Sequence, residues 1–167
     1  CSSHMDSIPI IALTGQVPTY GIGKDFFQEA DITGITMPVV KHSYLVLEAS
    51  QIPKTVRKAF LISSTGRPGP TLIDLPKDIT SGPFTGDSLD PAMDIPGYKV
   101  PEKPNKRDII KMAKAFKGAK KPLLLVGHGA VIAHAGEAVK KLAEKTGIPV
   151  AATRSRMYSF IPSGNSS

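Results

Sequence analysis

The first half of the chain alternates short apolar runs with segments that favour helices. Residues 8–15 form a nearly continuous apolar run that ends in glycine, a pattern typical of a parallel strand buried on both faces. Residues 37–41 and 71–76 are two further strand candidates, and Pro38 makes the first of these short or places it at a sheet edge. This alternation predicts an α/β fold with a parallel sheet and right-handed crossovers.

Two helices are expected between these strands. Residues 25–30 are long enough only for a short helix, whereas Ile52 and Pro53 begin a longer one, because proline is favoured in the first turn. Glycine and proline in residues 65–70 end that helix. Its apolar side is predicted to consist of four residues: Val56, Ala59, Phe60 and Ser63.

Residues 80–104 separate this region from a second one. They contain many prolines and glycines and no periodicity, and they are too long for an ordinary loop inside a compact domain. The second region, residues 105–153, reads as a helix followed by one βαβ unit. The expected elements are a helix capped by Asn105, a strand at 123–126, a turn at 127–130, a helix at 133–145 ended by Gly147, and a strand at 148–152.

Both ends of the chain differ from the rest. Residues 1–5, with the sequence CSSHM, resemble the remnant of an expression tag and are left out of the fold prediction. Residues 154–167 have neither helical nor strand period and end in small polar residues, which indicates a non-native tail. A native loop docked by Tyr158 and Phe160 is the alternative.

Composition excludes several classes of protein. The single cysteine cannot form an internal disulfide, and no apolar run approaches the roughly 20 residues that cross a bilayer. The net charge of +7 favours anionic partners. The lysine-rich helix faces lack interleaved aromatic residues, so we expect neither a nucleic-acid nor a membrane partner.

Two motifs have the character of phosphate sites. Gly127-His128-Gly129 lies between a strand and a helix, where doubly wound sheets bind phosphate, although Ile132 stands where the fingerprint requires its third glycine. The alternative is a plain tight turn with His128 facing solvent. Arg67, on a glycine- and proline-rich loop, suits bidentate contact with a phosphate, and the alternative is a solvated arginine.

Carboxylates give a weaker indication of chemistry. Asp74 and Asp78 flank residues 75–77 and have the spacing of an acid–base pair, but aspartates that hold the local backbone are the more ordinary interpretation. Gly86-Asp87-Ser88 has no strand before it, so we predict no metal site there.

Four stretches together resemble the catalytic subunit of the acetolactate synthase (acetohydroxyacid synthase) family of thiamine diphosphate enzymes. They are DSIPIIALTGQVP at residues 6–18, IGKDFFQEAD at 22–31, VKHSY at 40–44 and TGRPGPTLIDLPKD at 65–78. The βαβ unit at 122–153 is similar to the start of the central domain of that family. The resemblance covers nearly all of residues 6–153.

This resemblance implies a fold, a reaction and cofactors. Residues 6–79 are expected to be the C-terminal half of the domain that binds the thiamine pyrimidine, and residues 105–153 the start of a Rossmann-like, FAD-binding central domain. Members of the family join two 2-keto acids, such as pyruvate, with loss of CO2 in branched-chain amino acid biosynthesis. They use thiamine diphosphate, Mg²⁺ and FAD, and they work as homo-oligomers with the active site between two subunits. A cytoplasmic location is expected.

The resemblance also implies roles for individual residues. Phe27 and Gln28 match the segment that faces the reaction site, and Pro18 and Lys77 match the rim of the substrate channel, with Lys77 counted among the catalytic candidates. The residues that match the FAD site are Arg67, Gly127, Gly129 and Thr153. His128 departs from the family's Gly-Gly-Gly turn.

The catalytic glutamate of the family and its magnesium–diphosphate domain match nothing in these residues. We therefore expect the chain alone to bind no cofactor and to form no acetolactate. Two alternatives remain open: a residual FAD- or nucleotide-binding module, and a truncated chain that folds as a structural dimer.

Overall fold

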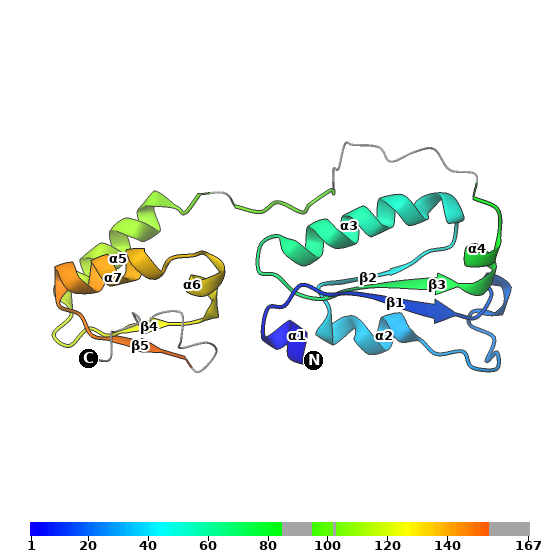
Figure 1. The fold of residues 1–167 in the computed structure, drawn as a ribbon, viewed down its shortest axis with the longest axis horizontal. Coiled ribbons are helices and arrows are strands. Elements are labelled where there is room, and N and C mark those ends of the chain that lie inside the picture. Colours follow the sequence, from blue (N-terminus) through cyan, green and yellow to red (C-terminus); the bar gives the residue numbers. More distant parts are fainter. Residues whose placement is uncertain (85–94, 102, 154–167) are drawn as a thin grey trace, which may run out of the picture. The chain divides into compact units, whose positions relative to one another are not determined.

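The computed structural model describes residues 1–84, 95–101 and 103–153, and the chain divides into two compact units, Cys1–Pro101 and Glu102–Ser167. The predicted tail at 154–167 and the Gly86-Asp87-Ser88 motif lie outside the described residues. Each unit contains its own parallel sheet (Figure 1). The α/β class predicted from the alternation of elements is confirmed.

The first unit is built on three parallel strands in the order β1-β3-β2, so the last strand along the chain lies in the middle. These strands are β1 (Ile11–Gln16), β2 (His42–Leu45) and β3 (Thr71–Pro76). Thr71 pairs with Ile11 on one side and with His42 on the other. All three strands therefore run the same way and end at the same side of the sheet, which we call the carboxyl end of the first sheet.

Helices cover both faces of this sheet. The long helix α3 (Ile52–Ser64) lies on one face and the short helix α2 (Ile32–Thr36) on the other (Figure 1). Helix α4 (Lys77–Ser81) follows β3 directly, and α1 (Ser2–Met5) lies at the start of the chain. Three single 3-10 turns complete the unit: Thr19–Gly21, Met37–Val39 and Ala49–Gln51.

The core of the first unit lies between α3 and β3. Val46, Ala59 and Ile73 are buried there, and β3 is buried along almost its whole length. Partly buried side chains complete this cluster: Ile11, Tyr44, Ile52, Val56, Leu75 and Ile79. The central strand is enclosed because helices cover both faces of the sheet and a neighbouring strand lies on each side of β3 (Figure 1).

Burial differs from the sequence prediction at two places. The run at 8–15 is not buried on both faces, because β1 is an edge strand and Leu13 is 64% exposed. On α3, Phe60 was expected in the core and is 62% exposed, whereas Thr55 and Ile62 are buried. The buried side of α3 is therefore rotated toward Thr55 and Ile62.

Two predicted elements were wrong. The strand expected at 37–41 is a 3-10 turn followed by β2 from His42, because Pro38 has no N–H for a strand ladder and suits the first turn of a helix. The helix expected at 25–30 is a loop. The helix begins instead at Ile32, where the Asp31 side chain accepts a hydrogen bond from the Gly34 N–H and caps it.

The second unit contains a two-stranded parallel sheet of β4 (Leu124–Val126) and β5 (Val150–Ala152). Helix α7 (Gly136–Thr146) connects the strands, and Gly147 ends it in the left-handed conformation with φ of 68°, as predicted. The turn predicted at 127–130 is a short helix, α6 (His128–Ile132). His134, with φ of 50°, separates helix α6 from helix α7, so α7 starts later than expected.

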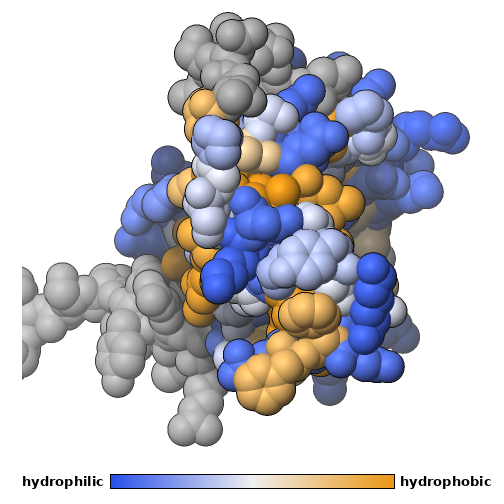
Figure 2. Space-filling view, turned by 90° about the vertical axis from the view of Figure 1, so that its right-hand side faces the viewer, coloured by the Kyte–Doolittle hydropathy of each residue, from blue (hydrophilic) through white to orange (hydrophobic). Residues whose placement is uncertain are grey.

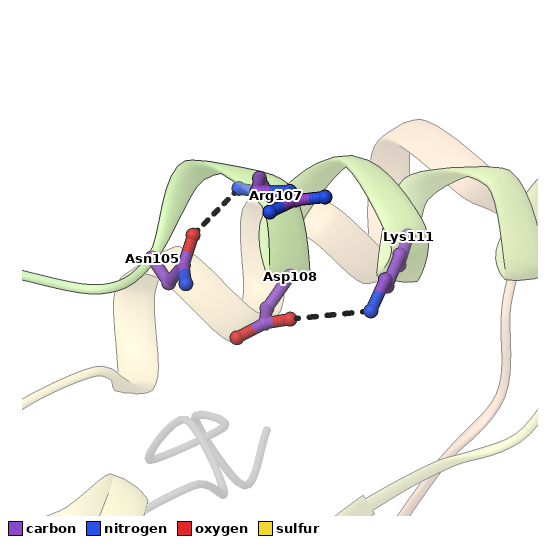
Figure 3. A network of polar contacts seen from close by, with 4 residues as sticks. All are labelled: Asn105, Arg107, Asp108 and Lys111. Carbon is purple, nitrogen blue, oxygen red and sulfur yellow. Dashed lines mark hydrogen bonds and ion pairs between the residues drawn. The ribbon is translucent and has the colours of Figure 1, made fainter.

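Helix α5 (Lys106–Gly118) precedes this sheet. The Asn105 side chain accepts a hydrogen bond from the Arg107 N–H at 2.9 Å, which confirms the predicted cap (Figure 3). Asp108 forms an exposed ion pair with Lys111 at 3.8 Å. None of the α5 side chains is buried among the described residues, although Ile109 and Ile110 were expected on its apolar side.

No helix within the described part of the chain is both long and apolar enough to span a membrane.

Candidate functional site

The carboxyl end of the first sheet brings several predicted site residues to one place. Pro18 follows β1 by two residues, and Lys77 is the first residue of α4, directly after β3. Gln16 and Pro76, which end these two strands, are paired in the sheet. Ligands bind at this end of the strands in open parallel sheets, so the position suits a substrate.

A hollow of about 390 Å³ opens at this end of the sheet. Lys77 is the cationic side chain among its lining residues: Leu13, Thr14, Gly15, Gln16, Leu75, Lys77 and Thr80. Figure 2 looks onto this side of the first unit, where apolar side chains protrude beside hydrophilic ones. A mostly apolar wall with a lysine at its border suits a small anionic ligand.

The buried carboxylate of Asp74 holds two of the side chains that line the hollow, Thr14 and Gln16. Asp74 is 1% exposed and accepts hydrogen bonds from the Thr14 hydroxyl at 2.7 Å and the Gln16 side-chain amide at 3.0 Å. The same Gln16 amide donates to the Ala30 carbonyl at 2.9 Å. Asp74 thus acts through Gln16 to hold the end of the loop that leaves β1.

Asp78 holds the beginning of the same loop. Its carboxylate accepts hydrogen bonds from the Thr19 hydroxyl and from the Thr19 N–H. The Thr19 hydroxyl, and to a lesser extent its N–H, keep the pKa of Asp78 below the usual range. Asp74 and Asp78 therefore have separate structural partners, which favours structural roles over that of an acid–base pair: Asp78 holds the Thr19 backbone, whereas Asp74 binds two side chains.

Phe27 and Gln28 lie in this loop, between its two fixed ends. Phe27 is 84% exposed, and Gln28 adopts the left-handed conformation with φ of 64°. Glu29 follows them and accepts hydrogen bonds from the N–H groups of Gly23 and Phe26. The structure thus places Pro18, Phe27 and Gln28 on one loop, which begins and ends at the carboxyl end of the first sheet.

Arg67 does not join this group. It precedes β3 and so lies at the amino end of that strand, while Lys77 follows the carboxyl end. Its guanidinium donates hydrogen bonds to the Ser7 hydroxyl at 2.9 Å and to the carbonyls of Met5 and His4 at 3.1 and 3.3 Å. Residues 4–7, part of which was assigned to a tag remnant, therefore occupy this arginine in the structure.

The second unit brings two other predicted residues together. The Thr153 N–H donates to the Val126 carbonyl at 3.0 Å, which places Thr153 beside the end of β4. A Cβ added at Gly127 would lie 3.7 Å from the Thr153 hydroxyl, so the two residues are neighbours at the carboxyl end of the second sheet. Gly129 lies one residue into α6, in an exposed position.

His128 differs from its prediction as a solvent-facing side chain. It is half-buried, and its Nδ1 atom is buried without a hydrogen-bond partner among the described residues. His128 is the first residue of the short helix α6, where an open turn was expected.

Sequence reasoning missed Gln16 and the structural use of Asp74. The available signal was the polar spacing of Thr14 and Gln16 at the end of an apolar run, because side chains two apart on a strand share a face. Cations have no comparable site: the described residues contain no cluster of three His, Cys, Asp or Glu side chains that would hold a metal ion.

Comparison with known proteins shows which proteins this chain is similar to. The model of the central domain of thiamine pyrophosphate enzymes matches residues 109–166, and this is the class of protein that the second unit defines. The chain is 49% identical over 151 residues to the acetolactate synthase large subunit of Mycobacterium tuberculosis, covering 90% of this chain and 24% of that protein. The Corynebacterium glutamicum acetolactate synthase large subunit is 44% identical over 162 residues, covering 95% of this chain and 25% of the relative.

A third relative gives the same result. The probable acetolactate synthase large subunit of Methanocaldococcus jannaschii is 44% identical over 154 residues, covering 91% of this chain and 26% of its own length. The chain thus spans about a quarter of the length of these relatives. It belongs to the acetolactate synthase family of thiamine pyrophosphate enzymes.

Proposed function

We propose that this chain forms part of an acetolactate synthase catalytic subunit, which joins two 2-keto acids such as pyruvate with loss of CO2. The observation that carries the proposal is the identity of 44–49% to acetolactate synthases, which extends over nine-tenths of the chain. Pro18 and Lys77 at the carboxyl end of the first sheet support it, as does the loop that starts there and carries Phe27 and Gln28.

In this proposal the first unit forms part of the wall of the substrate channel. A 2-keto acid carries a carboxylate, and the Lys77 ammonium at the border of the hollow attracts it. The exposed Phe27 ring offers an apolar surface to the body of the substrate, and the Gln28 amide offers both a donor and an acceptor. Pro18 shapes the rim beside it, in the loop that follows the neighbouring strand β1.

Thiamine diphosphate supplies the chemistry of the reaction, because it stabilises the carbanion left when a 2-keto acid loses CO2. The described residues contain no group of three His, Cys, Asp or Glu side chains that could hold the Mg²⁺ of a bound diphosphate. We assign that Mg²⁺ site to other parts of the catalytic subunit and derive no step through it.

We further propose that the second unit contributes to an FAD site. Gly127, which carries no side chain, lies beside the Thr153 hydroxyl at the carboxyl end of β4 and β5, and this fits the close approach of a nucleotide to the backbone. Gly129 completes the proposed set in this unit, and the resemblance adds Arg67, which lies in the first unit. A half-buried His128 replaces the second glycine of the family's turn, so its ring would border the nucleotide.

The domain assignment follows from these roles. Residues 6–79 belong to the pyrimidine-binding domain, residues 80–104 to a linker and residues 105–153 to the central domain. We propose a cytoplasmic homo-oligomer with 2-keto acids as substrates, and neither nucleic acid nor membrane as partner.

Pyruvate turnover tests the proposal. We expect no acetolactate from the 167-residue chain supplied with thiamine diphosphate, Mg²⁺ and FAD, and acetolactate from a complete catalytic subunit that contains it. In the complete subunit, Lys77→Ala should lower kcat/KM for pyruvate, while Lys54→Ala, at an exposed position on α3, should not. Turnover by the chain alone would contradict the proposal that it supplies only part of the catalytic subunit. An unchanged kcat/KM in the Lys77 variant would contradict the assignment of Lys77 to the substrate site.

A further inference from the structure

The loop that carries Phe27 and Gln28 has a constrained backbone despite its lack of regular structure. Gly23, Asp25 and Gln28 all adopt positive φ angles, of 76°, 53° and 64°. Residues other than glycine rarely do so, and such conformations persist only where surrounding contacts hold them. Asp25 and Gln28 therefore require a contact that maintains the shape of the loop.

The Glu29 side chain provides that contact. Its Oε1 accepts a hydrogen bond from the Gly23 N–H, and its Oε2 accepts one from the Phe26 N–H at 2.9 Å. The backbone adds a hydrogen bond from the Glu29 N–H to the Phe26 carbonyl, also at 2.9 Å. One carboxylate thus connects two separate positions of the loop backbone, Gly23 and Phe26, with one oxygen for each.

Two further contacts hold the loop, one within it and one to the end of β1. The Phe26 ring packs against Gly21, where an added Cβ would lie 3.0 Å from it, and meets the Tyr20 ring edge-on at 5.9 Å. Gln16 holds Ala30 at the other end. Phe26 is 43% exposed, about half as much as its neighbour Phe27 at 84%.

We propose that Glu29 is a positioning residue: by binding the Gly23 and Phe26 N–H groups, its carboxylate fixes the outward presentation of Phe27 and Gln28 to the substrate. This inference rests on the proposed function, because it takes Phe27 and Gln28 to face the reaction site. In this proposal Glu29 acts through Phe27 and Gln28, because each of its oxygens accepts a hydrogen bond from a backbone donor of the loop.

The ionisation of Glu29 agrees with this role. The N–H groups of Gly23 and Phe26 hold the pKa of its carboxyl below the ordinary value of 4.5. The contact is therefore complete at neutral pH and is lost only as the pH falls through the lowered pKa. The other charged side chains of the loop are Lys24, Asp25 and Asp31, and the pKa of Asp31 is lowered by its own contacts with Gly34 and Thr33.

Hydrogen exchange in the 167-residue chain tests the contact itself. Glu29→Ala should speed exchange of the Gly23 and Phe26 amides by about tenfold, and Glu29→Gln, which keeps one acceptor oxygen, should do so by less. Glu48→Gln, a change at an exposed glutamate outside the loop, is the matched control and should leave both amides unchanged. Unchanged exchange in the Glu29→Ala variant would overturn the proposal.

Kinetics of the complete catalytic subunit test the positioning role. Glu29→Gln should lower kcat/KM for pyruvate by about tenfold and Phe27→Ala by at least as much, and the double variant should lose little more than Phe27→Ala alone, because coupled residues are not additive. Fully additive losses would mean that Glu29 acts by general stabilisation, and they would overturn the proposal.

The two assays separate failure of this inference from failure of the proposed function. If Phe27→Ala and Gln28→Ala leave pyruvate turnover unchanged, the assignment of the reaction site is wrong, whatever the exchange data show. If those variants lower turnover and Glu29→Gln does not, the site stands and the positioning role of Glu29 is wrong.

Discussion

The two units use the same alternation of parallel strands and helices, but they enclose their apolar side chains very differently. In the first unit, Val46, Ala59 and Ile73 are at most 1% exposed. Among the described residues of the second unit, the buried apolar side chains are Val126 and Ile148, at 8% and 7% exposure. A three-stranded sheet has a central strand to enclose, whereas both strands of a two-stranded sheet are edges.

The long helices show what this difference means for reading a sequence. Both α3 and α5 carry apolar residues at helical spacing and have 13 residues each. Ala59 and Ile62 of α3 are buried against the sheet, whereas Ile109 and Ile110 of α5 are 44% and 56% exposed. Periodicity therefore predicts a helix and its apolar side, but the area that this side buries depends on the partner surface.

Truncation of the central strand should have the largest effect. Ile73→Ala should destabilise the first unit by about 2–5 kcal/mol, because it leaves a cavity between β3 and α3. Leu125→Ala in β4, at a side chain 71% exposed, should change stability by no more than about 0.5 kcal/mol. Urea unfolding followed by residue-resolved hydrogen exchange measures both. Equal losses in the two strands would remove the contrast between the units.

Removal of the buried carboxylate should come next. Asp74→Ala leaves the Thr14 hydroxyl and the Gln16 amide without their acceptor and should cost about 1–3 kcal/mol, measured by urea unfolding. Amide exchange near Ala30 should also accelerate, since Gln16 holds that carbonyl. The matched control is Asp108→Ala, an exposed aspartate in α5, with an expected loss of about 0.5 kcal/mol. A loop unaffected by Asp74→Ala would contradict the link through Gln16.

The cap of α5 probes the second unit alone. Asn105→Ala removes the acceptor of the Arg107 N–H and should destabilise α5 by about 0.5–2 kcal/mol, seen as faster exchange in its first turn. Exchange in β3 should stay the same. Lys111→Ala, which breaks only the exposed ion pair, should have a smaller effect that disappears at high salt. Faster exchange in β3 would show that the two units are energetically coupled.

The smallest expected effect concerns acid. The Thr19 contacts lower the pKa of Asp78 below its ordinary value of 3.8, so this pair stabilises the first unit above that value and the contribution is lost as the pH falls through the lowered pKa. Thr19→Val removes the hydroxyl donor and keeps the N–H. The variant should therefore lose less stability on acidification, which thermal unfolding at neutral and acidic pH would measure. An unchanged difference between the two pH values would contradict the role of the hydroxyl.

Local chemistry made part of the fold predictable. Strand β3 has the predicted bounds because its apolar run is enclosed by Pro70 and Lys77, and α5 starts where Asn105 provides a cap. By contrast, residues 25–30 were assigned to a helix. Their conformation depends on the Glu29 carboxylate, a contact that no residue propensity encodes.

The site was predictable only in part. Resemblance named Pro18, Phe27, Gln28 and Lys77, and the rule that parallel strands end together explains why Pro18 and Lys77 lie at one end of the sheet. The connection from Asp74 through Gln16 to Ala30 was missed, because it depends on the register in which β1 pairs with β3. That register joins residues about 60 positions apart.

The central place of β3 also sets the order in which the first unit can assemble. Among the strands that the structure describes, neither β1 nor β2 has a partner before residues 71–76 are available, since the two do not pair with each other. During synthesis of the 167-residue chain, β1 and β2 can therefore pair with β3 only after most of the first unit has left the ribosome. Nascent chains that stop short of Thr71 should remain open to proteases and to chaperones, and those that extend past α4 should not.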